Sequence, residues 1–172
     1  MNYNLKTILN YIIKDTMNIV KTIEQYDENN SYFCESIKNN IMNDSVFIRI
    51  LYSTNFFVMN GIYLYVNLNI INIEKFYNKY KCNFNVALNK ELICKIKMIE
   101  ENLLKKININ NKMPQYKIFE QLKNGNIKIF CDNNIIKTNN QFILKISGIW
   151  ENVQHYGLTY KFMAPNDMYS VL

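Results

Sequence analysis

Residues that punctuate regular structure are scarce in this sequence of 172 residues, which contains four glycines, two prolines and a single arginine. It has one histidine, His155, and four widely spaced cysteines with no C-x-x-C pair, which excludes a structural zinc site of the usual spacing. Phosphate-cradling loops, dinucleotide-binding fingerprints and nucleophile elbows do not occur. We therefore expect neither a metal nor another cofactor, and the chain provides no argument for an enzyme.

Long apolar runs are also missing, and none approaches the roughly 18 residues of a membrane span. No charged-plus-apolar leader opens the chain. We expect a soluble cytoplasmic protein without a membrane partner. The cysteines are most simply free core thiols in a reducing compartment: Cys34, Cys82, Cys94 and Cys131.

The chain is basic, with a formal net charge of +6 and a pI near 9.0. A basic balance of this size points toward nucleic acid or another anionic surface. The abundance of Asn, Lys, Ile and Tyr beside a single arginine, Arg49, is also what AT-rich codons produce. Charge alone leaves both explanations open, so the positions of the lysines matter more than their number.

The periodicity of the chain changes along its first third. Residues 4–26 place apolar side chains at helical spacing, which predicts a helix, and residues 27–33 read as a loop. From residue 46 the period becomes two, as in a strand.

Residues 89–107 carry the clearest helical pattern of the chain. Asn89 suits the cap at the start, and Lys105 and Lys106 suit the C-terminal end of the helix dipole. We expect the acidic pair Glu100-Glu101 and the lysines on the solvated surface. The apolar stripe consists of Leu92, Ile96, Ile99, Leu103 and Ile107.

Two Asn-Gly pairs lie between alternating segments, which is the strongest short-range signal of a two-residue hairpin. At Asn60-Gly61 the expected hairpin has one apolar face, typical of a core, made of Phe57, Met59, Ile62, Leu64 and Val66. Its other face has too many aromatic side chains to be simply solvated, and consists of Phe56, Val58, Tyr63 and Tyr65.

The second Asn-Gly pair, Asn124-Gly125, predicts a hairpin over residues 116–132. One face of this hairpin is apolar, with Glu120 as a misfit. Lysines and phenylalanines would interleave on the other face, which suits a phosphate backbone and stacked bases at once. The alternative is a half-exposed sheet covered by helices or by a partner subunit.

The order of elements is helix, several strands, helix, strands and a final hairpin, without an internal repeat or linker. This order predicts an α+β protein that is mainly β: a small antiparallel OB-like barrel with an N-terminal helix and one helix before the last strands. We expect a single domain over residues 1–172, in which 1–45 form a helical and loop extension and 164–172 a short tail.

The stretch 142–163, "FILKISGIWENVQHYGLTYKFM", contains two of the four glycines and the only tryptophan. It resembles the C-terminal hairpin of single-stranded DNA-binding proteins of large nucleocytoplasmic DNA viruses and yeast cytoplasmic linear plasmids, which look like the OB-fold binders of small tailed phages. Residues 84–107 are consistent with the strand and acidic helix of that family. The chain departs from the phage-type proteins in its tail, which has one acid, Asp167, and a late aromatic, Tyr169.

The resemblance implies sequence-tolerant binding of single-stranded DNA during replication of a viral or plasmid-like genome, in the host cytoplasm or a viral replication compartment. Partners would be single-stranded DNA, replication proteins such as a polymerase or helicase, and further copies of the chain. The phage-type proteins recruit replication partners through a long acidic tail. This chain has no such tail, so the resemblance does not support recruitment by that route. We predict the nucleic-acid contacts at Arg49, Phe56, Tyr63, Tyr65, Lys117, Phe119, Lys123, Lys128, Phe130, Lys145 and Lys161.

Within the final hairpin, Gly148 suits a strand bend or a close backbone approach, and Gly157 suits a positive φ. Trp150 alternates with Phe142, Leu144 and Ile146, which favours a core position over a stacking position. Lys145 and Lys161 would then lie on the faces opposite Trp150 and Tyr160 and contact phosphates. A different reading of the aromatic faces makes the protein a non-catalytic interaction subunit of a viral-type replication or transcription complex.

Overall fold

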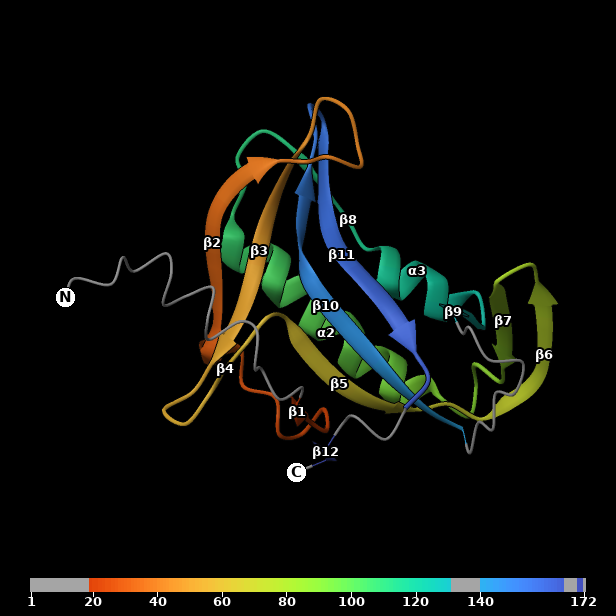
Figure 1. Ribbon diagram of the computed structural model, residues 1–172. Helices are drawn as coiled ribbons and strands as arrows, with labels where there is room; N and C mark the ends of the chain where they lie inside the picture. Colours follow the sequence, from red (N-terminus) through yellow and green to blue (C-terminus); the bar gives the residue numbers. More distant parts are fainter. Residues whose placement is uncertain (1–18, 131–139, 166–169, 172) are drawn as a thin grey trace.

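A computed structural model describes residues 19–130, 140–165 and 170–171 (Figure 1). Strands dominate this part of the chain, and two helices accompany them. The elements in chain order are β1 (Ile19–Val20), a 3-10 turn η1 (Glu28–Asn30), β2 (Ser31–Lys38), β3 (Val46–Ser53), β4 (Val58–Met59), β5 (Ile62–Asn67), β6 (Ile70–Phe76), β7 (Lys79–Phe84), α2 (Lys90–Ile107), β8 (Met113–Gln115), α3 (Lys117–Lys123), β9 (Asn126–Phe130), β10 (Gln141–Glu151), β11 (His155–Met163) and β12 (Ser170–Val171).

Ten of the strands form one mixed sheet, in the order β2-β3-β10-β11-β9-β7-β6. In addition, β4 pairs with β3, β5 with β10, and β8 with β11. Most pairs are antiparallel, but β8 and β9 run parallel to β11, so the purely antiparallel sheet expected from the sequence is wrong. The predicted class, mainly β with helices, is confirmed. The path of the described strands ends at β2 and β6 without closing into a barrel.

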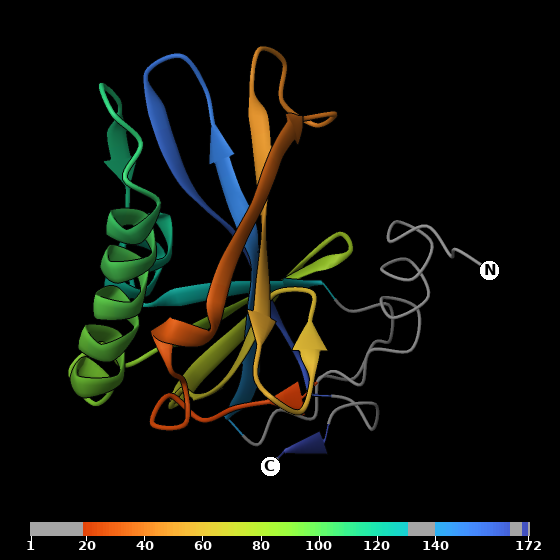
Figure 2. The same ribbon diagram turned by 90° about the vertical axis from the view of Figure 1, so that its left-hand side faces the viewer.

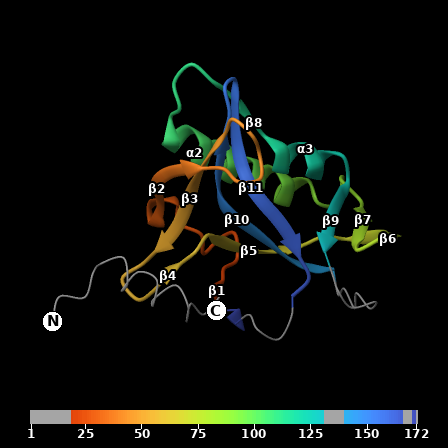
Figure 3. The ribbon, with the colours of Figure 1, turned by 45° about the horizontal axis from the view of Figure 1, so that its top comes forward.

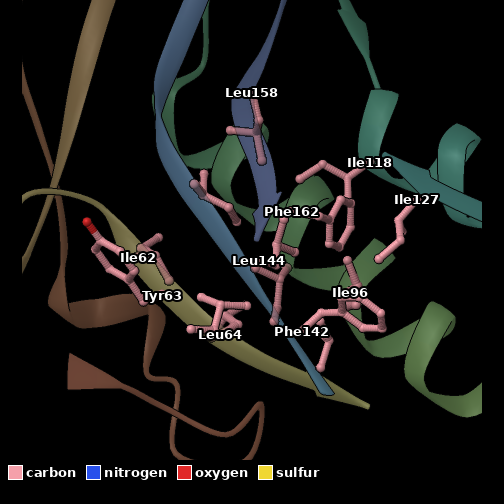
Figure 4. Close-up of a cluster of buried hydrophobic side chains, with 14 of the residues drawn as sticks. Ile62, Tyr63, Leu64, Ile96, Ile118, Ile127, Phe142, Leu144, Leu158 and Phe162 are labelled. Atoms are coloured by element: carbon pink, nitrogen blue, oxygen red, sulfur yellow. The ribbon is translucent and has the colours of Figure 1, made fainter. Parts of the chain in front are cut away.

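The long helix α2 covers one face of this sheet, as Figure 2 shows. Leu144, Leu158 and Phe162 of the sheet face Ile96 of α2 and Ile118 of α3 (Figure 4). All five side chains are at most 2% exposed, so the core lies between the sheet and these helices. We call this side of the sheet the inner face and the opposite side the outer face.

The predicted helix over residues 89–107 is confirmed as α2, with both lysines in its last turn. Ile96, Ile99 and Leu103 of the predicted stripe are buried. The expected side-chain cap is wrong, because the Asn89 amide donates to the carbonyl oxygen of Asn85 (2.6 Å) instead of accepting from the helix.

The predictions for the first third of the chain are partly wrong. Ile19 and Val20, inside the helix predicted over residues 4–26, form β1, which pairs with β12. Residues 21–26 form a bridge and a turn instead of a helix, and residues 4–18 lie outside the described part. The predicted loop 27–33 contains η1 and the first residues of β2. The strand forms there because β3 lies beside it, with Ser31 opposite Tyr52. Residue 46 begins β3, as the change of period predicts.

The hairpin predicted at Asn60-Gly61 does not form, although Gly61 makes a turn with a φ of 104°. After the turn the chain leaves β3, because β5 pairs with β10 over six residues, whereas β4 pairs with β3 over two. The alternation predicts burial in part. Met59, Ile62, Leu64 and Val66 of the expected core face are buried, but Phe57 of that face is half-buried and Tyr63 of the other face is buried.

The hairpin predicted at Asn124-Gly125 is also wrong, because residues 117–123 form helix α3. Ile118 and Leu122 are one helical turn apart and both are buried. Glu120, the misfit of the strand pattern, is exposed and pairs with Lys117 (3.0 Å). Gly125, with a φ of 68°, ends the helix and leads into β9.

The final hairpin is confirmed as β10 and β11. A β-bulge between Ile146 and Gly148 shifts the alternation by one residue. Ile149 therefore takes the core position with 0% exposure, and Trp150 moves to the outer face and is half-buried. The prediction of Trp150 in the core, opposite to Lys145, is wrong for this reason.

The cysteines differ in their surroundings, so the expectation of core thiols holds only in part. Cys82 is buried, and burial raises the pKa of its thiol to about 11. Cys34 is half-buried and Cys94 is exposed, while Cys131 lies outside the described residues. All three described cysteines are free thiols.

Candidate nucleic-acid interface

Four lysines line up across neighbouring strands on the outer face. Lys145 of β10 is directly opposite Lys161 of β11, and Lys128 of β9 is directly opposite Lys81 of β7. The pairing of Phe162 with Ile129 places Lys161 beside Lys128, since the residues before a parallel pair point to the other face together. We call these four residues the lysine row.

The lysine row concentrates positive charge, with the carboxylate of Glu74 on β6 directly opposite Lys81 at its end. Like charges directly opposite on neighbouring strands destabilise a sheet. Within the described residues, none of the four lysines forms a salt bridge. Such a row is suited to a polyanion whose charges follow one another across the strands.

Lys145 is the most enclosed member of the row. Its ammonium nitrogen lies 4.8 Å from the centre of the Tyr63 ring, and Arg49 lies nearby on β3. Burial, with a smaller contribution from Arg49, lowers the pKa of Lys145 below its ordinary value. A phosphate at this point would favour the charged form again.

A groove of about 720 Å³ adjoins the row between β7, β9 and α3. Figure 3 shows how α3 lies alongside β11, between β8 and β9. Lysines and amide side chains make up most of its wall, together with the rings of Tyr80 and Tyr160 and the carboxylate of Glu120. The other lining residues are Lys79, Lys81, Lys117, Gln121, Asn124, Asn126 and Lys128. We call it the basic groove.

Two side chains hold α3 in place beside the basic groove. The Tyr160 hydroxyl on β11 bonds with the carbonyl oxygen of Lys117 (3.0 Å) and with Oε1 of Gln121 (2.7 Å). Burial raises the pKa of Tyr160 to about 12, so the hydroxyl keeps its proton. The Glu100 carboxylate of α2 accepts hydrogen bonds from the backbone N–H groups of the second and third residues of α3, Ile118 (3.0 Å) and Phe119 (2.8 Å).

The expectation that Glu100 lies on the surface is therefore wrong. Its side chain is 0% exposed, and burial raises its pKa to about 7. The first backbone N–H groups of a helix have no carbonyl acceptor within that helix. The Glu100 carboxylate accepts two of these N–H groups of α3, and so links α2 to α3.

A second groove, of about 640 Å³, lies on the outer face next to the basic groove. Phe47 of β3 and Trp150 of β10, which are directly opposite each other, line it together with the loop after β2. Lys117 and Tyr160 line both grooves, so the two grooves are adjacent. We call the second one the aromatic groove.

The structure brings together five of the predicted contact residues. Lys128, Lys145 and Lys161 belong to the lysine row, and Lys117 lies between the two grooves. Arg49 is on the outer face opposite Gly148, where its Nη1 donates to Oδ1 of Asn60 (2.8 Å).

The other predicted contacts do not gather there. Tyr63 is only 4% exposed beneath Lys145, and Tyr65 is half-buried. Phe119 packs against the core with Lys97 over its ring (5.1 Å), because α3 turns it away from Lys117. Phe56 and Lys123 are exposed but line neither groove, and the Phe130 side chain lies outside the described part.

The sequence-based prediction missed Lys79, Lys81 and Phe47. A signal for the two lysines was present, since "KYKCNF" at residues 79–84 alternates polar and apolar side chains and so places Lys79 and Lys81 on one face of a strand. Tyr80, Cys82 and Phe84 are the buried partners in this alternation.

No protein-family model matches this chain, and neither the curated proteins nor the solved structures contain a match. Across residues 19–130, 140–165 and 170–171, no three His, Cys, Asp or Glu side chains gather where they could hold a metal ion. Among the same residues, neither helix has the length and apolar character to cross a membrane.

Proposed function

We propose that the protein binds single-stranded DNA on the outer face of its sheet, without sequence preference. The observation that carries the proposal is the lysine row, four cations on adjacent strands that form no salt bridge within the described residues, although Glu74 is directly opposite Lys81 at the end of the row. Each phosphate that meets a lysine releases condensed counterions, which drives binding of any sequence. The continuation of the row into the basic groove extends the path for the backbone.

Preference for a single strand follows from the aromatic groove beside the row. Base stacking on aromatic side chains contributes about 1–3 kcal/mol per base and requires bases that are not paired. An OB-like architecture belongs to the same proposal, supported by the short strands and by the position of α2 before β10 and β11. A role in replication of a viral or plasmid-like genome rests on the resemblance of residues 142–163.

Salt dependence with matched lysine variants tests the proposal. Lys128→Ala with Lys161→Ala removes two charges from the row, and Lys90→Ala with Lys105→Ala removes two from exposed positions on α2. Affinity for a labelled thymidine oligonucleotide is measured at several salt concentrations. The row variant should lower the slope of log affinity against log salt by about 1.4, and the α2 variant should leave it nearly unchanged.

Equal slopes for the two variants would reduce the interaction to general attraction between a basic protein and a polyanion. Duplex DNA of the same length provides the second comparison, and we expect single strands to bind at least about tenfold more tightly. Equal affinity for both forms would contradict the proposal.

A protein-interaction subunit is the second candidate function. Exposed aromatic residues at two loops favour it, since Phe56 is 93% exposed and Tyr77 is 96% exposed. Substituting both by serine should leave DNA affinity unchanged if the lysine row binds DNA. The interaction function gains support if no nucleic acid binds at moderate salt.

A further inference from the structure

Two of the glycines lie directly beneath aromatic rings on the outer face. A Cβ atom at Gly148 would lie 2.5 Å from Cζ and 2.6 Å from Cε2 of Phe47. A Cβ atom at Gly157 would lie 3.0 Å from Cζ2 and 3.1 Å from Cε2 of Trp150. In each case the hypothetical Cβ atom would be almost equally close to two adjacent ring atoms. The edge of each ring therefore occupies the space that a side chain at the glycine would fill.

The role of Gly157 therefore differs from the expected one. Its φ is not positive, and the loop before β11 does not need a glycine there. The residue faces Trp150 across the hairpin, and any larger side chain would push the indole ring away. Both glycines thus leave room for the edge of an aromatic ring beside the backbone, where a Cβ atom would also meet the carbonyl oxygen of Ile48 or of Gln115.

The Arg49 guanidinium lies over the Phe47 ring, 5.9 Å from its centre. Phe47 and Trp150 are half-buried and both line the groove. The opposite wall comes from the loop after β2, where the Asn39 side-chain oxygen accepts the backbone N–H groups of Ile41 (3.0 Å) and Met42 (3.4 Å). These bonds shape the loop, so that Ile41 and Met42 line the groove.

We propose that the aromatic groove holds one nucleobase of the bound strand, stacked on Trp150 and Phe47. This inference rests on the proposed function. It names the site that holds one base of the strand whose phosphates follow the lysine row. Charge complementarity supports the occupant, because Lys38 lines the same groove as the two rings. Lys117, whose ammonium group is paired with Glu120 (3.0 Å), lines it as well. An apolar floor with cations at its rim suits a nucleotide, whose base is flat and whose phosphate is anionic.

Continuity with the lysine row gives the strand a defined course. Lys117 and Tyr160 belong to both grooves, so a phosphate at Lys117 can be followed by one at Lys128. The base at the end of this course stacks in the aromatic groove. Stacking accepts every base, in agreement with binding that is independent of sequence.

The chain contains a single tryptophan, so its fluorescence reports on this groove alone. The full-length protein is titrated with a thymidine oligonucleotide and, separately, with inorganic polyphosphate, which carries the charge but no bases. We expect the oligonucleotide to quench Trp150 emission and polyphosphate to bind with little quenching. Oligonucleotide binding without a change in emission would overturn the inference.

Variants at Trp150 give the energetic test. Trp150→Leu should weaken oligonucleotide binding about tenfold with an unchanged salt slope, and Trp150→Phe should stay within about threefold of the wild type because a flat ring remains. Circular dichroism establishes that each variant is folded. An equal loss for both variants, or no loss for Leu, would overturn the inference.

The two proposals fail in different ways. If DNA binds with a slope that depends on the lysine row but Trp150 emission is unaffected, the stacked base is wrong and the proposed function stands. If neither DNA nor polyphosphate binds, the proposed function itself is wrong.

Discussion

The inner and outer faces of the sheet are built from the same strands but have opposite effects on the stability of the fold. Leu144 and Phe162 face α2 and are at most 1% exposed, while their chain neighbours Lys145 and Lys161 form part of a row of cations. Burial of apolar surface on the inner face stabilises the fold. The repulsion between opposed lysines on the outer face opposes folding.

The two faces therefore affect the free energy of unfolding in opposite directions. Opposed lysines and a desolvated Lys145 are features that a sheet built only for stability would lack. Functional sites commonly keep such unfavourable arrangements because a ligand neutralises them. Substitutions on the two faces should therefore have opposite effects on folding.

The largest effect is expected on the inner face, from Leu144→Ala. Leu144 is 0% exposed in the centre of the core, and removing its side chain should lower the free energy of unfolding by about 3–4 kcal/mol. Urea denaturation measures the change. Lys161→Ala on the neighbouring strand should stay within about 0.5 kcal/mol of the wild type. Similar losses for the two variants would mean that the outer face is also packed.

A second effect concerns Glu100, which connects the inner face to α3. Its pKa is raised from 4.5 to about 7 in the folded protein, so the folded state holds the proton more tightly than the unfolded chain does. Its contribution to stability is complete below pH 4.5 and is lost as the pH rises through 7, by roughly 3 kcal/mol at most. Urea denaturation of wild type and Glu100→Gln between pH 5 and 8 measures this contribution as a difference.

The difference in unfolding free energy between wild type and Glu100→Gln should shrink as the pH increases. Glu101→Gln is the matched control, because Glu101 is adjacent in the chain, partly exposed and paired with Lys97 (3.3 Å). That variant should show little change with pH. A constant difference for Glu100→Gln would show that the carboxylate is not desolvated.

The smallest expected effect has the opposite sign and lies on the outer face. Lys128→Glu replaces the repulsion between Lys128 and Lys81 with attraction. It should raise the free energy of unfolding by at most about 0.5 kcal/mol, because Glu74 is already opposite Lys81 on β6. The same change should weaken binding of single-stranded DNA, since it places a carboxylate in the lysine row. Thermal denaturation and the binding titration together check it. A loss of stability would mean that Lys81 and Lys128 do not repel each other.

Local periodicity predicted the elements whose partners are adjacent in the chain. The stripe of Ile96, Ile99 and Leu103 identifies α2, and alternation over residues 142–163 identifies the hairpin of β10 and β11. In both cases one face is buried by its neighbours, so the pattern and the fold agree. The membership of Lys145 and Lys161 in the interface could be predicted for the same reason.

Asn-Gly pairs were less informative, because a turn signal does not determine which strands pair with each other after the turn. Gly61 turns the chain, but β5 pairs with the distant β10. Gly125 follows α3, whose residues alternate between polar and apolar side chains as in a strand. The helix forms because it packs both Ile118 and Leu122 on the core. Phe119 faces the core instead of the lysines as a consequence.

The spacing of apolar residues in the sequence sets which side chains share a face of each helix or strand. The tertiary structure decided which strands are neighbours, and so created the lysine row from β7, β9, β10 and β11. It also decided the position of Trp150, since one bulge residue moves the ring from the core to the outer face. The physical reason is that side-chain direction depends on local backbone geometry, whereas register depends on contacts between segments far apart in the chain.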